Sequence, residues 1–297
     1  MVWFRKVDFS FCKMKDILKL LRIKHYIKNT LVFVPLVFAG DLRFQKFLFC
    51  LAGFAAFCLI SSCSYIINDV RDIERDRFHP TKKNRPLASG AVSVRAGACI
   101  AATCFLLASG TVLALVAVYG VEYAAHGWLL LYFALNLAYS FGLKNIPVVD
   151  VVILMSGFLI RILFGAAIAG TFVSSWLYLT VMSGAFYFAL GKRRGEILRG
   201  GGVTRKVLEA YSHAFLDKFM YVSLAMANIF YALWAKEYPK RYMVLTVPIV
   251  VIVCMQYSLD VEGDSDGDPV EVVMRDRKLI FLVMLLLAFM ALVLFAL

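Results

Sequence analysis

Nine long apolar segments constrain this 297-residue chain more than any other feature of its sequence. They fall near residues 29–43, 46–67, 91–119, 127–143, 147–170, 174–190, 214–235, 241–259 and 279–296. A helix needs about 20 apolar residues to cross the hydrocarbon core of a bilayer. Backbone groups in lipid have no water to bond, so such segments must be helical. The sequence therefore predicts an all-α polytopic membrane protein built as a bundle of nine transmembrane helices.

Composition sets the chain apart from soluble proteins. Hydrophobic residues make up 62% of it and charged residues 18%, against about 45–50% and about 25% in soluble domains. A secreted disulfide scaffold, a disordered tail protein and a soluble nucleic-acid binder are disfavoured, and no nucleic-acid partner is expected. The net charge of +12 predicts basic cytoplasmic loops, a site for anions, or both.

The lysines and arginines predict how the chain is oriented. With nine crossings, 26 of the 32 basic residues fall on the side of the N-terminus and the even-numbered loops. Five fall on the opposite side, and Arg161 lies within the fifth span. Because basic residues accumulate in cytoplasmic loops, we expect the N-terminus in the cytoplasm, the C-terminus outside, and the protein in the cytoplasmic membrane.

The N-terminal segment does not have the pattern of a cleaved signal peptide. Its basic stretch is too long and its apolar segment begins too late. A helix over residues 9–24 would carry apolar side chains on one face, with lysines around them. This pattern is typical of an amphipathic helix at the membrane surface, and equally of an entry helix packed on the bundle. We expect residues 1–28 to form a cytoplasmic amphipathic segment and residues 29–297 a single transmembrane domain.

Acidic side chains collect where the second span ends. Asn68, Asp72 and Asp76 are spaced four residues apart, and Asp69 follows the first of them. Four residues turn a helix by about 400°, so the three would form one slowly drifting stripe with roughly 6 Å between steps. This separation suits a hydrated Mg²⁺ that shares its ligands with a diphosphate better than a closed protein cage. The alternative is a solvated helix end, but carboxylates at the mouth of an apolar bundle are rare unless they are functional.

Basic side chains follow the acidic stripe and recur further along the chain. Lys82 and Arg85 come directly after it, where they would neutralise the phosphates of a metal-bound diphosphate. Arg161 lies halfway along the fifth span, where a charge costs about 2.5–3.5 kcal/mol, so it should face a polar cavity or a carboxylate. Lys192 and Arg193 end the sixth span, as an anion clamp or as a cytoplasmic anchor.

Together these residues resemble the UbiA superfamily of intramembrane prenyltransferases over nearly the whole chain. The motif N-D-x-x-D-x-x-x-D at residues 68–76, in a chain of nine spans, is specific to that superfamily. The other matching pieces are His25-Tyr-Ile-Lys28-Asn29, Tyr65, His79-Pro80, Lys82-x-x-Arg85-Pro86, Tyr139-Ser-x-x-Leu-Lys144, Asp150, Ser156-Gly-Phe-x-x-Arg161, Gly191-Lys192-Arg193 and Arg275-Asp276-Arg277.

Within the superfamily, the chain is most similar to the phosphoribosyltransferases that act on decaprenyl phosphate. The quinone-type enzymes carry a second acidic motif, D-x-x-x-D, after the sixth span. Here the same region reads Gly191-Lys192-Arg193-Arg194-Gly195-Glu196. A basic cluster in place of the second metal-binding pair agrees with a donor that carries more phosphate.

The resemblance implies a reaction and assigns roles to the residues. It implies Mg²⁺-dependent transfer of a 5-phosphoribosyl group from phosphoribosyl diphosphate to a polyprenyl phosphate, with release of diphosphate, at a site facing the cytoplasm. The implied metal ligands are Asn68, Asp69, Asp72 and Asp76, of which Asn68, Asp72 and Asp76 form the catalytic set. The residues implied to bind the donor phosphates are Lys82, Arg85, Lys192 and Arg193. Lys28, Lys144 and Arg161 are implied to bind a phosphate of either the donor or the lipid, without a division between the two. Tyr65 and Tyr139 complete the substrate-binding set, and a homo-oligomer is compatible with the sequence.

Two other readings stay open from the sequence. A UbiA-type enzyme that prenylates an aromatic or quinone precursor would use a prenyl diphosphate donor, and the basic cluster at residues 191–196 counts against it. A transporter or lipid-binding membrane protein would distribute charges through several spans. Arg161 is the only lysine or arginine in the middle of a predicted span, so this pattern is poorly met.

Overall fold

The computed structural model describes residues 14–198, 206–263 and 269–296 of the chain. Within these ranges the secondary structure is entirely helical, with α-helices joined by turns and short 3₁₀ helices. The first half comprises α1 (Met14–Leu21), η1 (Ile23–Phe33), α2 (Val34–Phe38), α3 (Phe44–Arg71), α4 (Ile73–Arg77), η2 (Lys82–Asn84), α5 (Val94–Tyr119), α6 (Tyr123–Phe141) and η3 (Leu143–Asn145). The second half comprises α7 (Val149–Ala169), α8 (Ser175–Leu198), η5 (Lys206–Ala210), α9 (His213–Glu237), η6 (Arg241–Thr246), α10 (Val247–Glu262), α11 (Pro269–Arg275) and α12 (Arg277–Phe295).

The predicted all-α membrane class is confirmed. Five described segments are long and apolar enough to cross a bilayer, namely α3, α5, α7, η6 with α10, and α12. Each of the other four predicted spans also overlaps a helix, but those helices are shorter or carry more polar residues. The protein is therefore an integral membrane protein with several candidate spans, and the count of nine crossings stays a prediction.

The first predicted span is the least regular segment of the bundle. We expected a helix near residues 29–43, whereas a 3₁₀ helix has already begun at Ile23 and α2 ends at Phe38. Pro35 lies in the first turn of α2, a position where its missing N–H removes no intrahelical hydrogen bond. The change from 3₁₀ to α-helix therefore falls where the proline allows it.

A glycine brings this irregular segment against α7. A Cβ atom added at Gly165 would lie 2.1 Å from the carbonyl oxygen of Val32. Any side chain at that position would therefore push η1 away from α7. Gly165 lies one helical turn beyond Arg161, so this close approach sets the distance between η1 and the arginine within the fifth predicted span.

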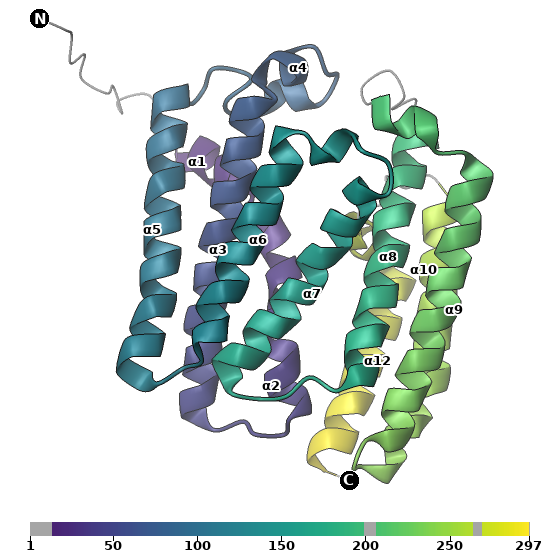
Figure 1. The fold of residues 1–297 in the computed structure, drawn as a ribbon. Coiled ribbons are helices and arrows are strands. Elements are labelled where there is room, and N and C mark those ends of the chain that lie inside the picture. The colour runs from purple at the N-terminus through teal and green to yellow at the C-terminus, as the bar shows by residue number, and fades with distance from the viewer. Residues whose placement is uncertain (1–13, 199–205, 264–268, 297) are drawn as a thin grey trace, which may run out of the picture.

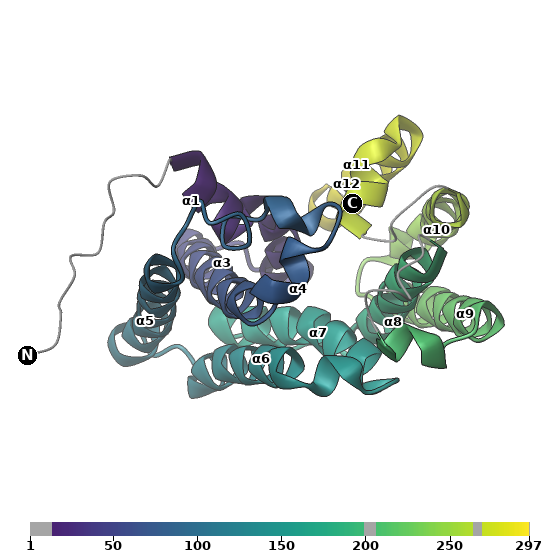
Figure 2. The same ribbon diagram turned by 90° about the horizontal axis from the view of Figure 1, so that it is seen from above.

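The long helices run roughly alongside one another, with α7 crossing the bundle diagonally (Figure 1). α1 and α4 lie at one end of the bundle, whereas α12 finishes at the opposite end (Figure 1). Seen from above, the helices follow an arc from α5 through α3, α6 and α7 to α8, α9 and α10 (Figure 2). The short elements that follow α3 and α6 therefore gather at one end, near the start of α7.

Candidate active site

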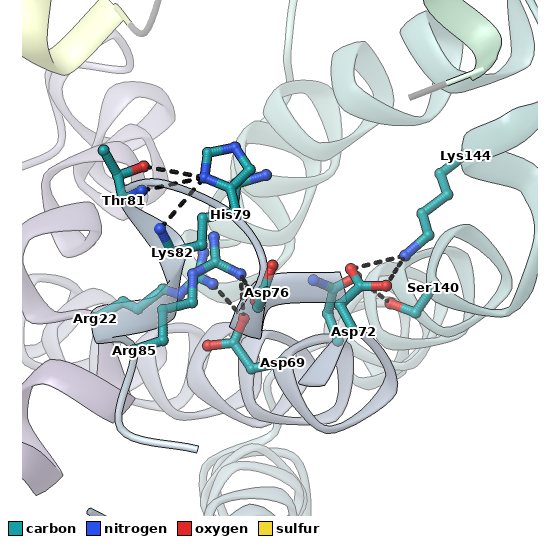
Figure 3. Close-up of polar contacts among 11 residues, drawn as sticks. Arg22, Asp69, Asp72, Asp76, His79, Thr81, Lys82, Arg85, Ser140 and Lys144 are labelled. Carbon is teal, nitrogen blue, oxygen red and sulfur yellow. Dashed lines mark hydrogen bonds and ion pairs between the residues drawn. The ribbon is translucent and has the colours of Figure 1, made fainter. Parts of the chain in front are cut away.

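The side chains of the acidic motif point in two directions. α3 ends at Arg71, and Asp72 caps it with φ −98° and ψ 6° before α4 begins at Ile73. We expected one stripe along Asn68, Asp72 and Asp76. Asn68 and Asp72 do share a side, facing Ser140 and Lys144, but Asp76 turns away from it, so the expected stripe fails at Asp76. Asp69 and Asp76 instead meet at Arg85, while Asp72 points toward Lys144 (Figure 3).

Two arginines hold Asp69 and Asp76. Arg85 Nη1 lies 2.9 Å from Asp69 Oδ1 and 2.7 Å from Asp76 Oδ2, so one nitrogen bridges two carboxylates. Arg22 Nη2 donates to the same Asp69 oxygen at 2.5 Å, and its guanidinium lies 4.7 Å from the centre of the Tyr65 ring. Both aspartates are buried. Their carboxylate oxygens therefore converge on a single cationic position.

Asp72 forms its own pair across the bundle. Lys144 Nζ lies 2.6 Å from Asp72 Oδ1 and 2.8 Å from Oδ2. Lys144 belongs to η3 and is itself buried. Beside this pair, Ser140 Oγ donates to Asn68 Oδ1 at 3.2 Å. The pair thus joins the end of α3 to the connection between α6 and α7.

The loop after α4 is ordered by a histidine. His79 Nδ1 accepts hydrogen bonds from the backbone N–H groups of Thr81 (3.3 Å) and Lys82 (3.4 Å) (Figure 3). Partial burial and the nearby Lys82 ammonium lower the pKa of His79 below its ordinary value. The ring is therefore held in the neutral form that accepts these bonds, which fixes the loop carrying Lys82 and Arg85.

A cavity of about 290 Å³ opens beside the acidic motif. It brings together eight of the predicted site residues, namely Lys28, Tyr65, Asn68, Lys82, Arg85, Tyr139, Arg161 and Lys192. Its lining holds six basic side chains, the five predicted ones and Arg22, against the one carboxylate of Glu196. Lining of this composition is suited to an anionic ligand.

Five of the predicted residues do not line this cavity. Asp69, Asp72, Asp76, Lys144 and Arg193 are absent from its lining. The first four form the ion pairs described above, so they reach a ligand only by exchanging partners. Their assignment as metal and substrate ligands stays a prediction.

Arg193 is held entirely by protein groups. Its side chain is fully buried and donates to Asp150 Oδ2 at 2.6 Å, to Glu196 Oε2 at 2.7 Å and to the Tyr139 hydroxyl at 3.0 Å. We expected Arg193 to bind a donor phosphate, but its guanidinium contacts protein groups and does not line the cavity. Arg193 instead holds Tyr139 and Glu196, which do line the cavity.

A tyrosine anchors the other side of this network. The Tyr211 hydroxyl donates to Asp150 Oδ1 at 2.6 Å and accepts from the Val148 backbone N–H at 2.6 Å. Burial and the bond to the Asp150 carboxylate raise the pKa of Tyr211 to about 12, so the hydroxyl stays protonated. Val148 has φ 67°, a rare conformation for a β-branched residue.

Arg161 has a different environment. Its Nε donates to Asn29 Oδ1 at 2.8 Å, Nη1 to the Gly157 carbonyl oxygen at 2.5 Å, and Nη2 to the Tyr132 hydroxyl at 3.2 Å. The guanidinium lies 5.0 Å from the ring centres of both Phe57 and Tyr132. All its hydrogen-bond partners among the described residues are neutral.

The sequence reasoning missed several residues of the lining. Arg22 was read only as part of an amphipathic segment, and Tyr132, Asn136 and Ser140 were not singled out. The last two stand four residues apart near the end of an apolar helix, so they share one face with Tyr132. This polar spacing was the available signal, whereas no pattern indicated that Arg22 reaches Asp69.

The residues fit a magnesium ion that shares its ligands with a phosphate. Within the described ranges, no three His, Cys, Asp or Glu side chains converge into a protein-built cage. Mg²⁺ is commonly held by one or two carboxylates together with substrate phosphates. Asp69 and Asp76 already place two oxygens around one cationic nitrogen of Arg85, and the basic lining is suited to the phosphates.

Comparison with known proteins agrees with this geometry. Residues 30–275 match the model of the UbiA prenyltransferase family. A decaprenyl-phosphate phosphoribosyltransferase of Corynebacterium glutamicum is 36% identical over 276 residues, which cover 88% of this chain and 81% of the relative. An enzyme of the same name from Mycobacterium tuberculosis is 32% identical over 283 residues, which cover 89% of each chain.

Solved structures agree on the fold. A UbiA homologue from Archaeoglobus fulgidus, bound to GPP and Mg²⁺, superimposes with a TM-score of 0.71. The match covers 94% of this chain and 99% of the homologue at 18% sequence identity. At this identity the likeness establishes the arrangement of helices and leaves the substrates to other arguments.

Proposed function

The chain belongs to the UbiA prenyltransferase family, and on this premise we propose that it transfers a 5-phosphoribosyl group from phosphoribosyl diphosphate to a polyprenyl phosphate, releasing diphosphate. One observation carries the proposal: six basic side chains line a single cavity beside three aspartates in a membrane-embedded bundle. A donor with a diphosphate and a further phosphate, together with a lipid phosphate, supplies anions for such a lining. A prenyl diphosphate and an aromatic acceptor bring fewer phosphate groups to this lining.

The chemistry asks mainly for electrostatic stabilisation and alignment. An oxygen of the lipid phosphate forms a bond to the anomeric carbon of the ribose. The bond from that carbon to the diphosphate breaks, and its electron pair leaves with the diphosphate. The attacking oxygen is already anionic, so no base has to remove a proton. Charge developing on the leaving group therefore has to be matched by fixed cations, while the two substrates are held in line.

The side chains divide these tasks. Asn68, Asp69, Asp72 and Asp76 would hold Mg²⁺, which when bound neutralises charge on the leaving diphosphate. Lys82 and Arg85, from η2 and the residue that caps it, would contact donor phosphates from one side of the cavity, and Lys192, from α8, from another. If the aspartates held the metal, Arg22, Arg85 and Lys144, which now pair with them, would be available to phosphate oxygens.

The placement of the site supports the proposed topology. We propose nine crossings, with residues 29–297 as one catalytic domain, residues 1–28 as a cytoplasmic segment and the cavity facing the cytoplasm. The acidic motif lies at the end of the bundle where α1 and α4 lie, and α12 finishes at the other end (Figure 1), as an odd number of crossings requires. The loops at the α1 end hold most of the basic residues, which favours the cytoplasmic side.

The experiment measures transfer directly. Purified protein in detergent, with Mg²⁺, labelled phosphoribosyl diphosphate and a polyprenyl phosphate, is expected to place label in the lipid fraction. Asp72→Asn should abolish this transfer, whereas Asp217→Asn, whose partner Arg194 lies outside the cavity, should not. A parallel arm offers a prenyl diphosphate and an aromatic acid. Product in that arm alone, with the Corynebacterium glutamicum enzyme as active control, would overturn the proposal in favour of aromatic prenylation.

A further inference from the structure

Arg161 presents a positive charge inside the membrane, and no described residue supplies a charged partner for it. It lies in α7, a candidate membrane span, and it is 5% exposed. Among the residues that the structure describes, it forms hydrogen bonds to Asn29, Gly157 and Tyr132 but no ion pair with a carboxylate. A charge in this position is costly unless an anion accompanies it. The structure therefore contains a buried cation whose counter-charge has to come from elsewhere.

The guanidinium also faces the space where an anion would lie. Arg161 lines the cavity, and its contacts use one N–H on each of its three nitrogens. A guanidinium carries a second N–H on both terminal nitrogens, in the fork that matches phosphate oxygens. The neutral contacts hold this fork in place, because Asn29, Gly157 and Tyr132 come from three different elements. The site is thus built for an oxyanion rather than for structural pairing.

The position of this cation relative to the acidic motif separates the two substrates. Arg161 contacts Phe57, which precedes Asn68 by eleven residues on α3, or about 16 Å along the helix. The acidic motif thus lies near the end of the bundle and Arg161 well inside it. In a displacement with inversion, nucleophile and leaving group lie on opposite sides of the anomeric carbon. With the diphosphate at the acidic motif, the nucleophile comes from the side of Arg161.

The surroundings of Arg161 select the same ligand. The Tyr132 ring flanks the guanidinium, and Tyr132 lines the cavity together with the apolar side chains of Ile153, Leu154 and Phe158. A phosphate on an isoprenoid chain brings an apolar tail into such a place. The ribose hydroxyls of the donor would instead lose water without enough polar partners.

We propose, on the basis of the proposed function, that Arg161 binds the phosphate of the isoprenoid acceptor and not a phosphate of the ribosyl donor. This divides the basic residues of the cavity by substrate: Arg161 takes the acceptor, and the basic residues beside the acidic motif take the donor. Asn29 and Tyr132 act as positioning residues, because they contact Arg161 rather than the reacting atoms.

The test measures binding without turnover. The probe is farnesyl phosphate, titrated onto the purified protein in detergent, and Mg²⁺ with phosphoribosyl diphosphate is titrated separately. Arg161→Gln is expected to weaken farnesyl phosphate binding by about 10-fold or more, as loss of a charge-assisted phosphate contact does. Binding of the donor should stay within about twofold. Farnesol, which lacks the phosphate, should bind equally to both proteins, and Arg194→Gln serves as the matched arginine control outside the cavity.

A second variant keeps the test decisive if the glutamine protein does not fold. Asn29→Asp places a carboxylate 2.8 Å from Arg161 Nε in the same shape, so it supplies a counter-charge. The substitution gives up the hydrogen bond that Asn29 Nδ2 donates to Cys58 Sγ, and a thermal melt verifies that the fold is kept. It is expected to weaken farnesyl phosphate binding as Arg161→Gln does. Weaker donor binding with unchanged farnesyl phosphate binding would overturn the assignment and place a donor phosphate at Arg161. Unchanged binding of both would show that Arg161 is structural.

These outcomes are distinguishable from failure of the proposed reaction. Loss of farnesyl phosphate binding in the variants, in a wild-type protein that transfers no phosphoribosyl group, supports the acceptor site and refutes the reaction. Transfer by the Asn29→Asp protein with an unchanged acceptor KM supports the reaction and refutes the acceptor site.

Discussion

Arg161 and Arg193 are two buried arginines on neighbouring helices, and they differ in what neutralises them. Arg193 on α8 is paired with Asp150 and Glu196, whereas Arg161 on α7 contacts an amide, a carbonyl and a hydroxyl. Arg193 lies behind the wall of the cavity, and Arg161 lines it. A buried charge with its own carboxylates supports the structure around it, while a buried charge held by neutral groups keeps its attraction for a ligand. The comparison separates two roles that a count of basic residues treats as one.

The largest effect is expected on breaking the Arg193 pair. Asp150→Ala leaves Arg193 fully buried with one carboxylate fewer and removes the acceptor of Tyr211. The free energy of unfolding should fall by about 3–5 kcal/mol, as is typical when one partner of a buried ion pair is removed. Thermal unfolding in detergent measures this. Asp217→Ala, which breaks the more exposed pair with Arg194, should change stability by less than about 1 kcal/mol. Equal losses in the two proteins would contradict a structural role for Arg193.

A glycine next to Arg161 tests how its neutral contacts are held. Gly165→Ala places a Cβ 2.1 Å from the Val32 carbonyl oxygen, so η1 has to move and Asn29 moves with it. We expect a loss of about 1–3 kcal/mol in stability from overpacking, together with weaker binding of farnesyl phosphate. Gly184→Ala is the matched control, since nothing lies within 4 Å of an added Cβ there, and it should be neutral or slightly stabilising. If both alanine proteins keep wild-type stability and binding, the close approach of η1 has no bearing on Arg161.

Two adjacent residues sharpen the distinction between ligand-facing and structural cations. Lys192 lines the cavity, while Arg193 beside it does not. Lys192→Ala should lower kcat/KM for phosphoribosyl diphosphate by about 10-fold, roughly 1.4 kcal/mol, and leave the melting temperature unchanged. Arg193→Ala should instead lower the melting temperature. Steady-state kinetics and thermal melts of both proteins check this, and the reverse pattern would exchange the two roles.

The smallest effect concerns a titrating group outside the bundle core. His79 accepts two backbone hydrogen bonds when neutral, and its pKa is lowered in the folded protein. The unfolded state therefore binds the proton more readily than the folded state. The contribution of this group to stability is fully present above the ordinary histidine pKa of about 6.5 and is lost as the pH falls through the folded value. His79→Asn should remove a small pH-dependent component from melting curves recorded between pH 5 and pH 8. A larger pH dependence in the variant would contradict this sign.

Local patterns predicted the parts of the molecule that depend on one stretch of chain. The apolar segments indicated the helices, and the cost of a mid-span charge indicated that Arg161 faces a polar cavity or a carboxylate, of which the structure shows the cavity. Contacts between distant segments were not readable in this way. Asp72 and Lys144 are 72 residues apart, and no local pattern pairs them. The pair of Arg22 with Asp69 was equally unreadable. Arg193 follows Lys192 directly, so the sequence predicted one phosphate-binding role for both and did not indicate that Arg193 pairs with Asp150. The kink at Asp72 also separated residues that ideal helical spacing would have aligned.

Val148 shows one further consequence of the Arg193 network. Its φ of 67° is a conformation that glycine adopts freely and that is unfavourable for a side chain branched at Cβ. Local sequence preference and backbone conformation therefore disagree at this residue, which is the definition of local frustration in an energy landscape. The Tyr211 hydroxyl holds the turn through the Val148 N–H and so links the frustrated residue to Asp150. The turn at Val148 is therefore less stable than it could be, although it adjoins the Tyr211–Asp150 contact that supports the cavity wall. Val148→Gly would relax the turn, because glycine adopts this φ without a steric penalty.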